Sequence, residues 1–210
     1  LAVWACACID PQRALRPDSY DYLRLAENVL RHGAFSLQAA PPWVPDTFRT
    51  PGYPLLLAPL KFVEEPPLLA LGLVQCFLGA WTAALAWRWT RSWAGPRGAA
   101  LAALILALDP VAVLHAPLAL TETLHLLLVT AAAALAWSAL RDPRPSGAAA
   151  SGLLWGLAAL TRPISIYLTL LLAGFWRRDR KALAAFLAAA YLLPGLWVAR
   201  NLGATGHLEF

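Results

Sequence analysis

A few charged and polar side chains interrupt the long apolar stretches of this 210-residue sequence, and their types could do chemistry. Four of them are carboxylates, Asp18, Asp21, Asp109 and Glu122, and a positioned carboxylate can accept a proton as a general base. Others are arginines, whose planar guanidinium can bind two oxygens of a phosphate at once. The whole set comprises Asp18, Asp21, Arg49, Tyr53, Asp109, Glu122, Arg162, Arg200 and Asn201.

The elements that position these residues are predicted to be membrane helices. The chain is 60% hydrophobic and only 14% charged, whereas a water-soluble domain carries about 25% charged residues. Its apolar residues form long blocks rather than amphipathic stripes, so a bilayer takes the place of a buried core. We therefore predict an all-α fold, a polytopic transmembrane helical bundle, with an amphipathic helix beside the membrane in the first outer loop. The net charge of +5 follows membrane topology, so no nucleic-acid partner is expected.

The apolar blocks predict about six helical spans between residues 66 and 198, within a single transmembrane domain over 1–210. The clearest span, 66–87, contains no charged residue and is long enough for the hydrocarbon core. Two helical hairpins, each with a polar break, and a last helix follow at 98–140, 147–176 and 182–198. We expect Leu1 to Ile9 to be the end of a first span in a fragment or processed product, and 199–210 to begin another outer loop.

Three short basic loops orient the chain in the membrane. They lie near residues 88–97, 141–144 and 177–181, and they hold nine of the 17 Lys and Arg residues against two of the 12 acidic ones. Short loops rich in Lys and Arg stay in the cytoplasm. The candidate residues fall at the opposite ends of the helices, so we expect them at the non-cytoplasmic face.

Residues 10–65 are predicted to form the first outer loop. Apolar residues at 22, 25, 26, 29 and 30 follow the helical period, Asp18 occupies the expected N-cap position, and Gly33 is a natural stop. Such an amphipathic helix should lie flat on the bilayer surface. The later apolar run Leu55 to Leu60 is too short to span.

Each candidate also has a purely structural interpretation. Glu122 could sit in a solvated turn, Arg162 could contact lipid headgroups at a helix end, and Asp18 could simply cap its helix. His115 and His125 could flank the outer turn around Glu122, with a structural role. The carboxylates could hold a divalent ion, but no metal motif stands out, and cofactors stay unknown.

The order of several short motifs resembles a known family. These motifs are Asp18-Ser-Tyr-Asp-Tyr-Leu-Arg-Leu-Ala-Glu-Asn-Val-Leu with Gly33, Arg49-Thr-Pro-Gly-Tyr-Pro, Thr121-Glu-Thr-Leu, Gly156-Leu-Ala-Ala-Leu-Thr-Arg-Pro, and Pro194 with Arg200-Asn201. Together they cover nearly the whole sequence. They resemble the membrane-embedded GT-C glycosyltransferases, above all bacterial members of glycosyltransferase family 39, related to protein O-mannosyltransferases and lipid A aminoarabinose transferase.

The resemblance implies a sugar transferase in a bacterial inner or plasma membrane. Its donor would be a polyprenyl-phosphate-linked sugar, and its acceptor a lipid, a glycan or a protein. An acidic residue in the first outer loop serves the family as catalytic base, and Asp18 matches it. Members often carry a second acidic residue directly after the first; Ser19 stands there instead, which makes Asp21 a reserve base. Substrate-binding roles then pass to the remaining candidates, Arg49, Tyr53, Glu122, Arg162 and Arg200.

Two other functions remain open at this point. A multi-span transporter or flippase could use the same polar residues for an anionic lipid, although transporters place polar groups at the membrane midplane. A non-catalytic membrane subunit or degraded paralogue is the other alternative.

Overall fold

The computed structural model describes residues 11–63, 67–142 and 144–210, and within these ranges the chain is helical and contains no strand. Its helices, in chain order, are η2 (Pro11–Ala14), α2 (Pro17–His32), α3 (Gly52–Leu57), η3 (Ala58–Phe62), α4 (Leu68–Leu108), α5 (Pro110–His115), α6 (Glu122–Arg141), α7 (Pro145–Thr161), α8 (Ser165–Ala173), η4 (Gly174–Trp176) and α9 (Arg180–Thr205). The predicted all-helical fold is confirmed. The expectation for Leu1 to Ile9 lies outside the described residues.

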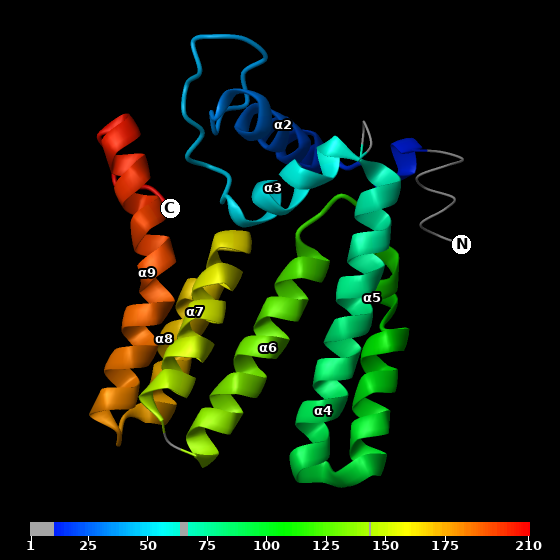
Figure 1. The fold of residues 1–210 in the computed structure, drawn as a ribbon, viewed down its shortest axis with the longest axis vertical. Helices are drawn as coiled ribbons and strands as arrows, with labels where there is room; N and C mark the ends of the chain where they lie inside the picture. Colours follow the sequence, from blue (N-terminus) through cyan, green and yellow to red (C-terminus); the bar gives the residue numbers. More distant parts are fainter. Residues whose placement is uncertain (1–10, 64–66, 143) are drawn as a thin grey trace.

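The long helices run up and down beside one another, and α2 and α3 lie across one end of them (Figure 1). α4 leaves that end, folds back at Gly95 and returns toward α5; α6, α7, α8 and α9 then alternate in direction. The polar breaks after α5 and after α7 therefore lie at the end that carries α2 and α3. The three basic loops lie at the opposite end of the bundle.

Three helices, α4, α6 and α9, are long and apolar enough to cross a membrane. α4 is not one straight rod, because Gly95 adopts a left-handed φ of 71° and the Pro96 that follows has no backbone N–H to donate. Large apolar side chains such as Phe77, Leu101 and Leu196 are exposed on the outside of the helices. An apolar surface of this extent suits contact with lipid rather than water.

Two helices extend past their predicted ends. α4 continues beyond residue 87 to the bend at Gly95, and α9 continues beyond residue 198 to Thr205. The physical reason is the placement of helix-breaking residues. α9 stops only where Gly206 takes a left-handed φ of 78°. Arg200 and Asn201 consequently lie on a helix and not in a loop.

Small residues bring α7 and α9 into close contact. The backbones approach most closely at Gly152 and Gly156 of α7, which face Phe186 and Ala190 of α9. A Cβ added at Gly156 would lie 2.7 Å from the carbonyl oxygen of Ala190. Close approach through small residues is the usual way in which membrane helices associate, and the glycine- and alanine-rich composition of α7 indicates it.

Gly156→Ala should therefore destabilise the bundle by about 1–3 kcal/mol, because the two helices must move apart to fit the new methyl group. Gly195→Ala is the matched control, since nothing lies within 4 Å of a Cβ there, and alanine favours a helix over glycine by about 0.5–1 kcal/mol. Thermal unfolding in detergent measures both. Equal melting temperatures for the two variants would contradict the tight α7–α9 contact.

α2 begins two residues earlier than predicted. Its N-cap is Arg16, Pro17 occupies the first helical turn, and the Ser19 hydroxyl accepts a hydrogen bond from the Arg16 N–H at 3.0 Å. The prediction that Asp18 is the N-cap is therefore wrong: Pro17 is well suited to the first helical position, which places Asp18 inside the first turn. The predicted stop is confirmed, because Gly33 ends the helix in the left-handed conformation with φ 64°.

Three contacts fasten α2 and α3 to the bundle. The Ser19 hydroxyl donates to the carbonyl of Ala119 at 2.9 Å, in the loop between α5 and α6. The Thr50 hydroxyl lies 3.4 Å from the carbonyl of Thr161, at the end of α7. Gly52 packs so closely on the same end of α7 that a Cβ would lie 2.6 Å from the Leu160 carbonyl oxygen. α2 and α3 are thereby held against the two polar breaks of the bundle.

Candidate active site

Arg49 joins the two aspartates of α2. Its Nη2 lies 2.8 Å from Asp18 Oδ1 and 2.8 Å from Asp21 Oδ2, and its Nε lies 3.2 Å from the same oxygen of Asp21. The two aspartates are three residues apart on a helix, so they project from the same face. Arg49 is largely shielded, with 19% of its side chain exposed, while Asp18 is 52% exposed. The cluster is a cation flanked by two carboxylates, of which Asp18 is the more exposed, 52% against 36% for Asp21.

The surroundings of Arg49 keep it in place. Its backbone N–H donates to Asp46 Oδ2 at 2.9 Å, and its guanidinium lies over the rings of Tyr22 and Phe48. Burial lowers the pKa of Arg49, but the hydrogen bonds to Asp21 and Asp18 outweigh burial, so the pKa is raised above its usual value. Desolvation also raises the pKa of Asp46, against the opposing effect of its hydrogen bond from Arg49.

A second ion pair connects the two polar breaks of the bundle. Arg162 Nη1 lies 2.9 Å from Glu122 Oε1, and both side chains are partly exposed. Glu122 is the first residue of α6, and Arg162 is the C-cap of α7. The second carboxylate oxygen of Glu122, Oε2, is buried and has no hydrogen-bond partner among the described residues. Glu122 therefore holds Arg162 at this end of the bundle through Oε1, while its Oε2 accepts no hydrogen bond from the described residues.

Two tyrosines lie between the two ion pairs. Tyr22 of α2 and Tyr53 of α3 meet edge to face, with ring centroids 5.2 Å apart. Desolvation raises the pKa of Tyr22, whose ring also feels the charges of Arg49, Asp18, Glu122 and Arg162. Burial raises the pKa of Tyr53 well above its usual value, with further contributions from Glu122 and Tyr22. The Thr50 hydroxyl, next to Arg49 in the chain, lies 3.4 Å from the carbonyl of Thr161, next to Arg162, so the two ion pairs lie on neighbouring segments.

The Tyr53 hydroxyl is buried and has no hydrogen-bond partner among the described residues. Because an unsatisfied buried polar group costs about 1–3 kcal/mol, Tyr53→Phe should leave stability unchanged or raise it. Tyr191→Phe is the matched control, since that hydroxyl donates to the Ile166 carbonyl at 3.2 Å and its loss should lower stability. Thermal unfolding of both variants measures the difference, and a lower melting temperature for Tyr53→Phe would contradict the unsatisfied hydroxyl.

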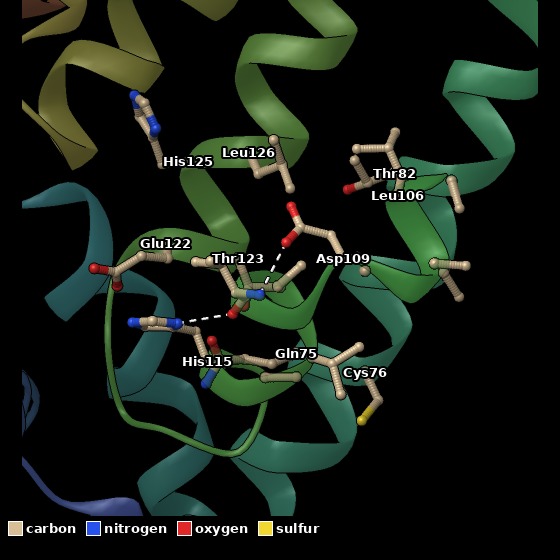
Figure 2. A pocket seen from close by; sticks show the side chains of 18 of the residues that line it. Gln75, Cys76, Thr82, Leu106, Asp109, His115, Glu122, Thr123, His125 and Leu126 are labelled. Atoms are coloured by element: carbon tan, nitrogen blue, oxygen red, sulfur yellow. Dashed lines mark hydrogen bonds between the residues drawn. The ribbon is translucent and has the colours of Figure 1, made fainter. Parts of the chain in front are cut away.

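A cavity of about 590 Å³ opens next to the Glu122–Arg162 pair, within the range of small-molecule sites. Its wall is mostly apolar and comes from the two arms of α4, from α5 and from α6. Figure 2 shows Glu122 and His115 at one end of it, and Thr82, Leu106 and Leu126 at the other. The cavity therefore joins a charged end to a mostly apolar wall, in which Asp109 is a second charged residue.

Two of the predicted site residues, Asp109 and Arg200, make hydrogen bonds to the backbone that stabilise the fold. Asp109 caps α5, because its Oδ1 accepts from the Val111 N–H at 2.8 Å, although it also lines the cavity. Arg200 does not line the cavity; it donates to the backbone carbonyls of Asp46 at 2.8 Å and Phe35 at 3.4 Å. The structure thus brings Asp18, Asp21, Arg49, Tyr53, Glu122 and Arg162 together, and it gives Arg200 a different environment.

Three residues near the site were not predicted from the sequence: Asp46, Tyr22 and Gln75. Asp46 and Tyr22 contact Arg49, and Gln75 is a buried side chain beside the cavity that donates to the Leu118 carbonyl at 2.6 Å. The spacing of Asp46 three residues before Arg49 is the one local signal that could have indicated its role. Within the described part of the chain, no group of three or more His, Cys, Asp or Glu residues is placed to hold a metal ion.

One comparison with known proteins gave a match. The family model described as dolichyl-phosphate-mannose-protein mannosyltransferase matches residues 49–199, a range that includes Arg49, Tyr53, Glu122 and Arg162 but not Asp18, Asp21 or Arg200. Searches of curated proteins and of solved structures gave no match. The match covers more than half of the sequence. This chain belongs to the dolichyl-phosphate-mannose-protein mannosyltransferase family, a family of membrane glycosyltransferases that use a lipid-linked sugar donor.

Proposed function

We propose that this protein transfers a sugar from a polyprenyl-phosphate donor to an acceptor hydroxyl at the non-cytoplasmic face of the membrane, with an aspartate of α2 as general base. The observation that carries the proposal is the juxtaposition described above: two carboxylates on one arginine, next to the Glu122–Arg162 pair and the apolar cavity. The position of the basic loops at the opposite end of the bundle supports the choice of face.

Asp18 is the better candidate for the base. Asp21 receives two hydrogen bonds from Arg49 on the same oxygen, so its carboxylate orients the arginine. Asp18 receives one such bond, on Oδ1, and about half of its side chain is exposed. An acceptor hydroxyl can therefore approach Asp18 more easily than Asp21, and Arg49 holds the carboxylate in one orientation.

Arg162 would bind the phosphate of the donor. It lies at the edge of the cavity, where its guanidinium has further donors beyond the one that Glu122 uses. The apolar wall between α4 and α6 would take the first part of the polyprenyl chain, and the membrane would take the rest. Glu122 keeps the arginine oriented before the phosphate arrives.

The reaction is a single displacement at the anomeric carbon. The acceptor oxygen forms a bond to that carbon while its proton passes to Asp18, and the bond from the carbon to the phosphate oxygen breaks. The lipid phosphate leaves with the electron pair of that bond. The growing negative charge on the phosphate is stabilised by Arg162, a cation that is already in place. Electrostatic stabilisation of this kind is usually the largest single contribution to catalysis.

The transporter alternative is disfavoured by where the polar residues lie. Asp18 lies on α2, Glu122 begins α6 and Arg162 caps the end of α7, and these parts of the helices lie at the same end of the bundle (Figure 1). A carrier instead needs a polar site at the membrane midplane that opens to both sides.

The proposal is tested by offering the complete protein, in sealed vesicles, either a polyprenyl-phosphate sugar or a nucleotide sugar. We expect transfer from the lipid-linked donor only, to an acceptor supplied on the side opposite the basic loops. A thiol placed in the 141–144 loop and labelled from outside or inside the vesicle reports the orientation. Transfer from the nucleotide sugar, or to an acceptor on the side of the basic loops, would count against the proposal.

A further inference from the structure

Arg200 closes the loop that precedes Arg49. The N–H of Asp46 donates to the carbonyl of Phe35 at 2.8 Å, which brings the two ends of the 35–46 loop together. Arg200, on α9, donates to both of these residues: Nη1 to the Asp46 carbonyl at 2.8 Å and Nη2 to the Phe35 carbonyl at 3.4 Å. A single guanidinium from the last described helix therefore holds the base of the loop.

Aromatic rings fix the plane of this guanidinium. It lies over Trp197 at 4.8 Å from the ring centroid and over Phe35 at 5.6 Å, and the two rings meet edge to face. Asn201 Oδ1 accepts a further hydrogen bond from Nη1 at 2.9 Å. Only arginine combines stacking with several donors in one plane, so lysine could not reproduce the arrangement.

A short series of bonds leads from Arg200 to the aspartates. The carboxylate of Asp46, whose carbonyl Arg200 holds, accepts the backbone N–H of Arg49 at 2.9 Å. The side chain of Arg49 then contacts Asp18 and Asp21. The other part of the loop is fastened independently, because the buried amide of Asn28 donates to the carbonyls of Ser36 and Gln38. Within the described residues, the Asp46 end lacks such a side-chain anchor from α2 and is held by its bond to the Phe35 carbonyl and by Arg200.

We infer that Arg200 is a positioning residue, which acts through Asp46 to hold Arg49 against the two aspartates, and that it is not a ligand of the donor phosphate. The inference rests on the proposed function, and it names the residue that couples α9 to the site. Arg200 is also absent from the residues that line the cavity in the described part of the chain, which supports the same conclusion.

The test compares Arg200→Gln and Arg200→Lys in the complete protein, with Arg180→Gln as the matched control at the exposed opposite end of α9. The first readout is hydrogen exchange of the Asp46 and Arg49 amides, which needs no sugar transfer. The second is the split between kcat and KM for the lipid-linked donor. We expect faster exchange and a kcat lower by about 10- to 100-fold in both Arg200 variants, the cost of misplacing a reacting group by about 1 Å, with little change in KM.

The lysine variant separates positioning from phosphate binding. Lysine binds phosphate as a point charge, so a phosphate ligand would be largely rescued by Arg200→Lys, and KM would rise in Arg200→Gln. A positioning residue is not rescued. The double variant Arg200→Gln, Asp46→Ala adds a further test: if Arg200 acts through Asp46, the combined loss is smaller than the sum of the two single losses.

Unchanged exchange at Asp46 and Arg49, rescue by lysine, or additive losses would each overturn the inference. Failure of the proposed function is distinguishable from these results, because it shows as an absence of lipid-linked sugar transfer in the unmutated protein while the exchange measurement remains informative.

Discussion

Asp18→Asn is expected to lower the rate of sugar transfer by about 10²–10⁴-fold, the usual contribution of a positioned general base. Asparagine keeps the size of the side chain and can still accept a hydrogen bond from Arg49, which lies 2.8 Å from Asp18 Oδ1. What it loses is the ability to take the proton of the acceptor. Turnover of a polyprenyl-phosphate sugar by the complete protein, under saturating donor, measures the effect.

Two further variants are needed to interpret the result for Asp18→Asn. Asp21→Asn should cost less than Asp18→Asn, because Asp21 orients Arg49 with two hydrogen bonds on one oxygen rather than accepting the proton. Asp142→Asn should have no effect, since Asp142 lies at the opposite end of the bundle in an exposed pair with Arg144. A larger loss in Asp21→Asn than in Asp18→Asn would assign the base to Asp21.

Arg162→Gln is expected to cost about 10²–10³-fold in kcat, the effect of removing one preorganised donor from a developing negative charge. Glutamine also leaves the Glu122 carboxylate without the 2.9 Å partner that now satisfies one of its oxygens. Arg162→Lys should recover part of the activity, because lysine restores the charge but not the planar pair of donors. Single-turnover transfer from bound donor separates this effect from slow product release.

Glu122→Gln serves as the test of orientation in the same ion pair. It removes the negative charge that holds Arg162 while leaving an oxygen that can accept the same hydrogen bond. The loss should be smaller than for Arg162→Gln. Arg144→Gln, at the opposite end of the bundle, is the matched control. Full activity in Arg162→Gln would remove the arginine from the phosphate site.

The sequence was sufficient to predict the helices but not their ends. Apolar blocks between charged loops predicted helices within 98–140 and 147–176, where the structure has the second arm of α4 and the helices α5 to α8. Gly33 correctly predicted the end of α2. The N-cap of α2 and the last residue of α9 were predicted wrongly, because neighbouring residues compete for the position at which a helix begins or ends. Pro17 takes the first turn of α2 from Asp18, and α9 continues through Pro194 and Gly203 and ends only at Gly206.

The residues of the candidate site could be predicted only in part from the sequence. Topology placed the polar residues at one end of the helices, so Glu122 and Arg162 could be expected near each other. Arg49 lies 28 residues after Asp21 and 31 after Asp18, beyond the rest of α2 and the irregular segment that follows it, and no periodic pattern specifies such a contact. Arg200 is the clearest example: its charge suited phosphate, and only its position showed that it holds backbone carbonyls.

The most direct test of the central claim is single-turnover transfer by the complete protein in which both aspartates are replaced, Asp18→Ala with Asp21→Ala. The lipid-linked donor is bound first, its binding is measured, and the acceptor is then added. The site described here predicts that the donor still binds, through Arg162 and the cavity, and that no sugar is transferred above the uncatalysed rate. Transfer at the unmutated rate would show that neither carboxylate is the base and that the chemistry takes place elsewhere.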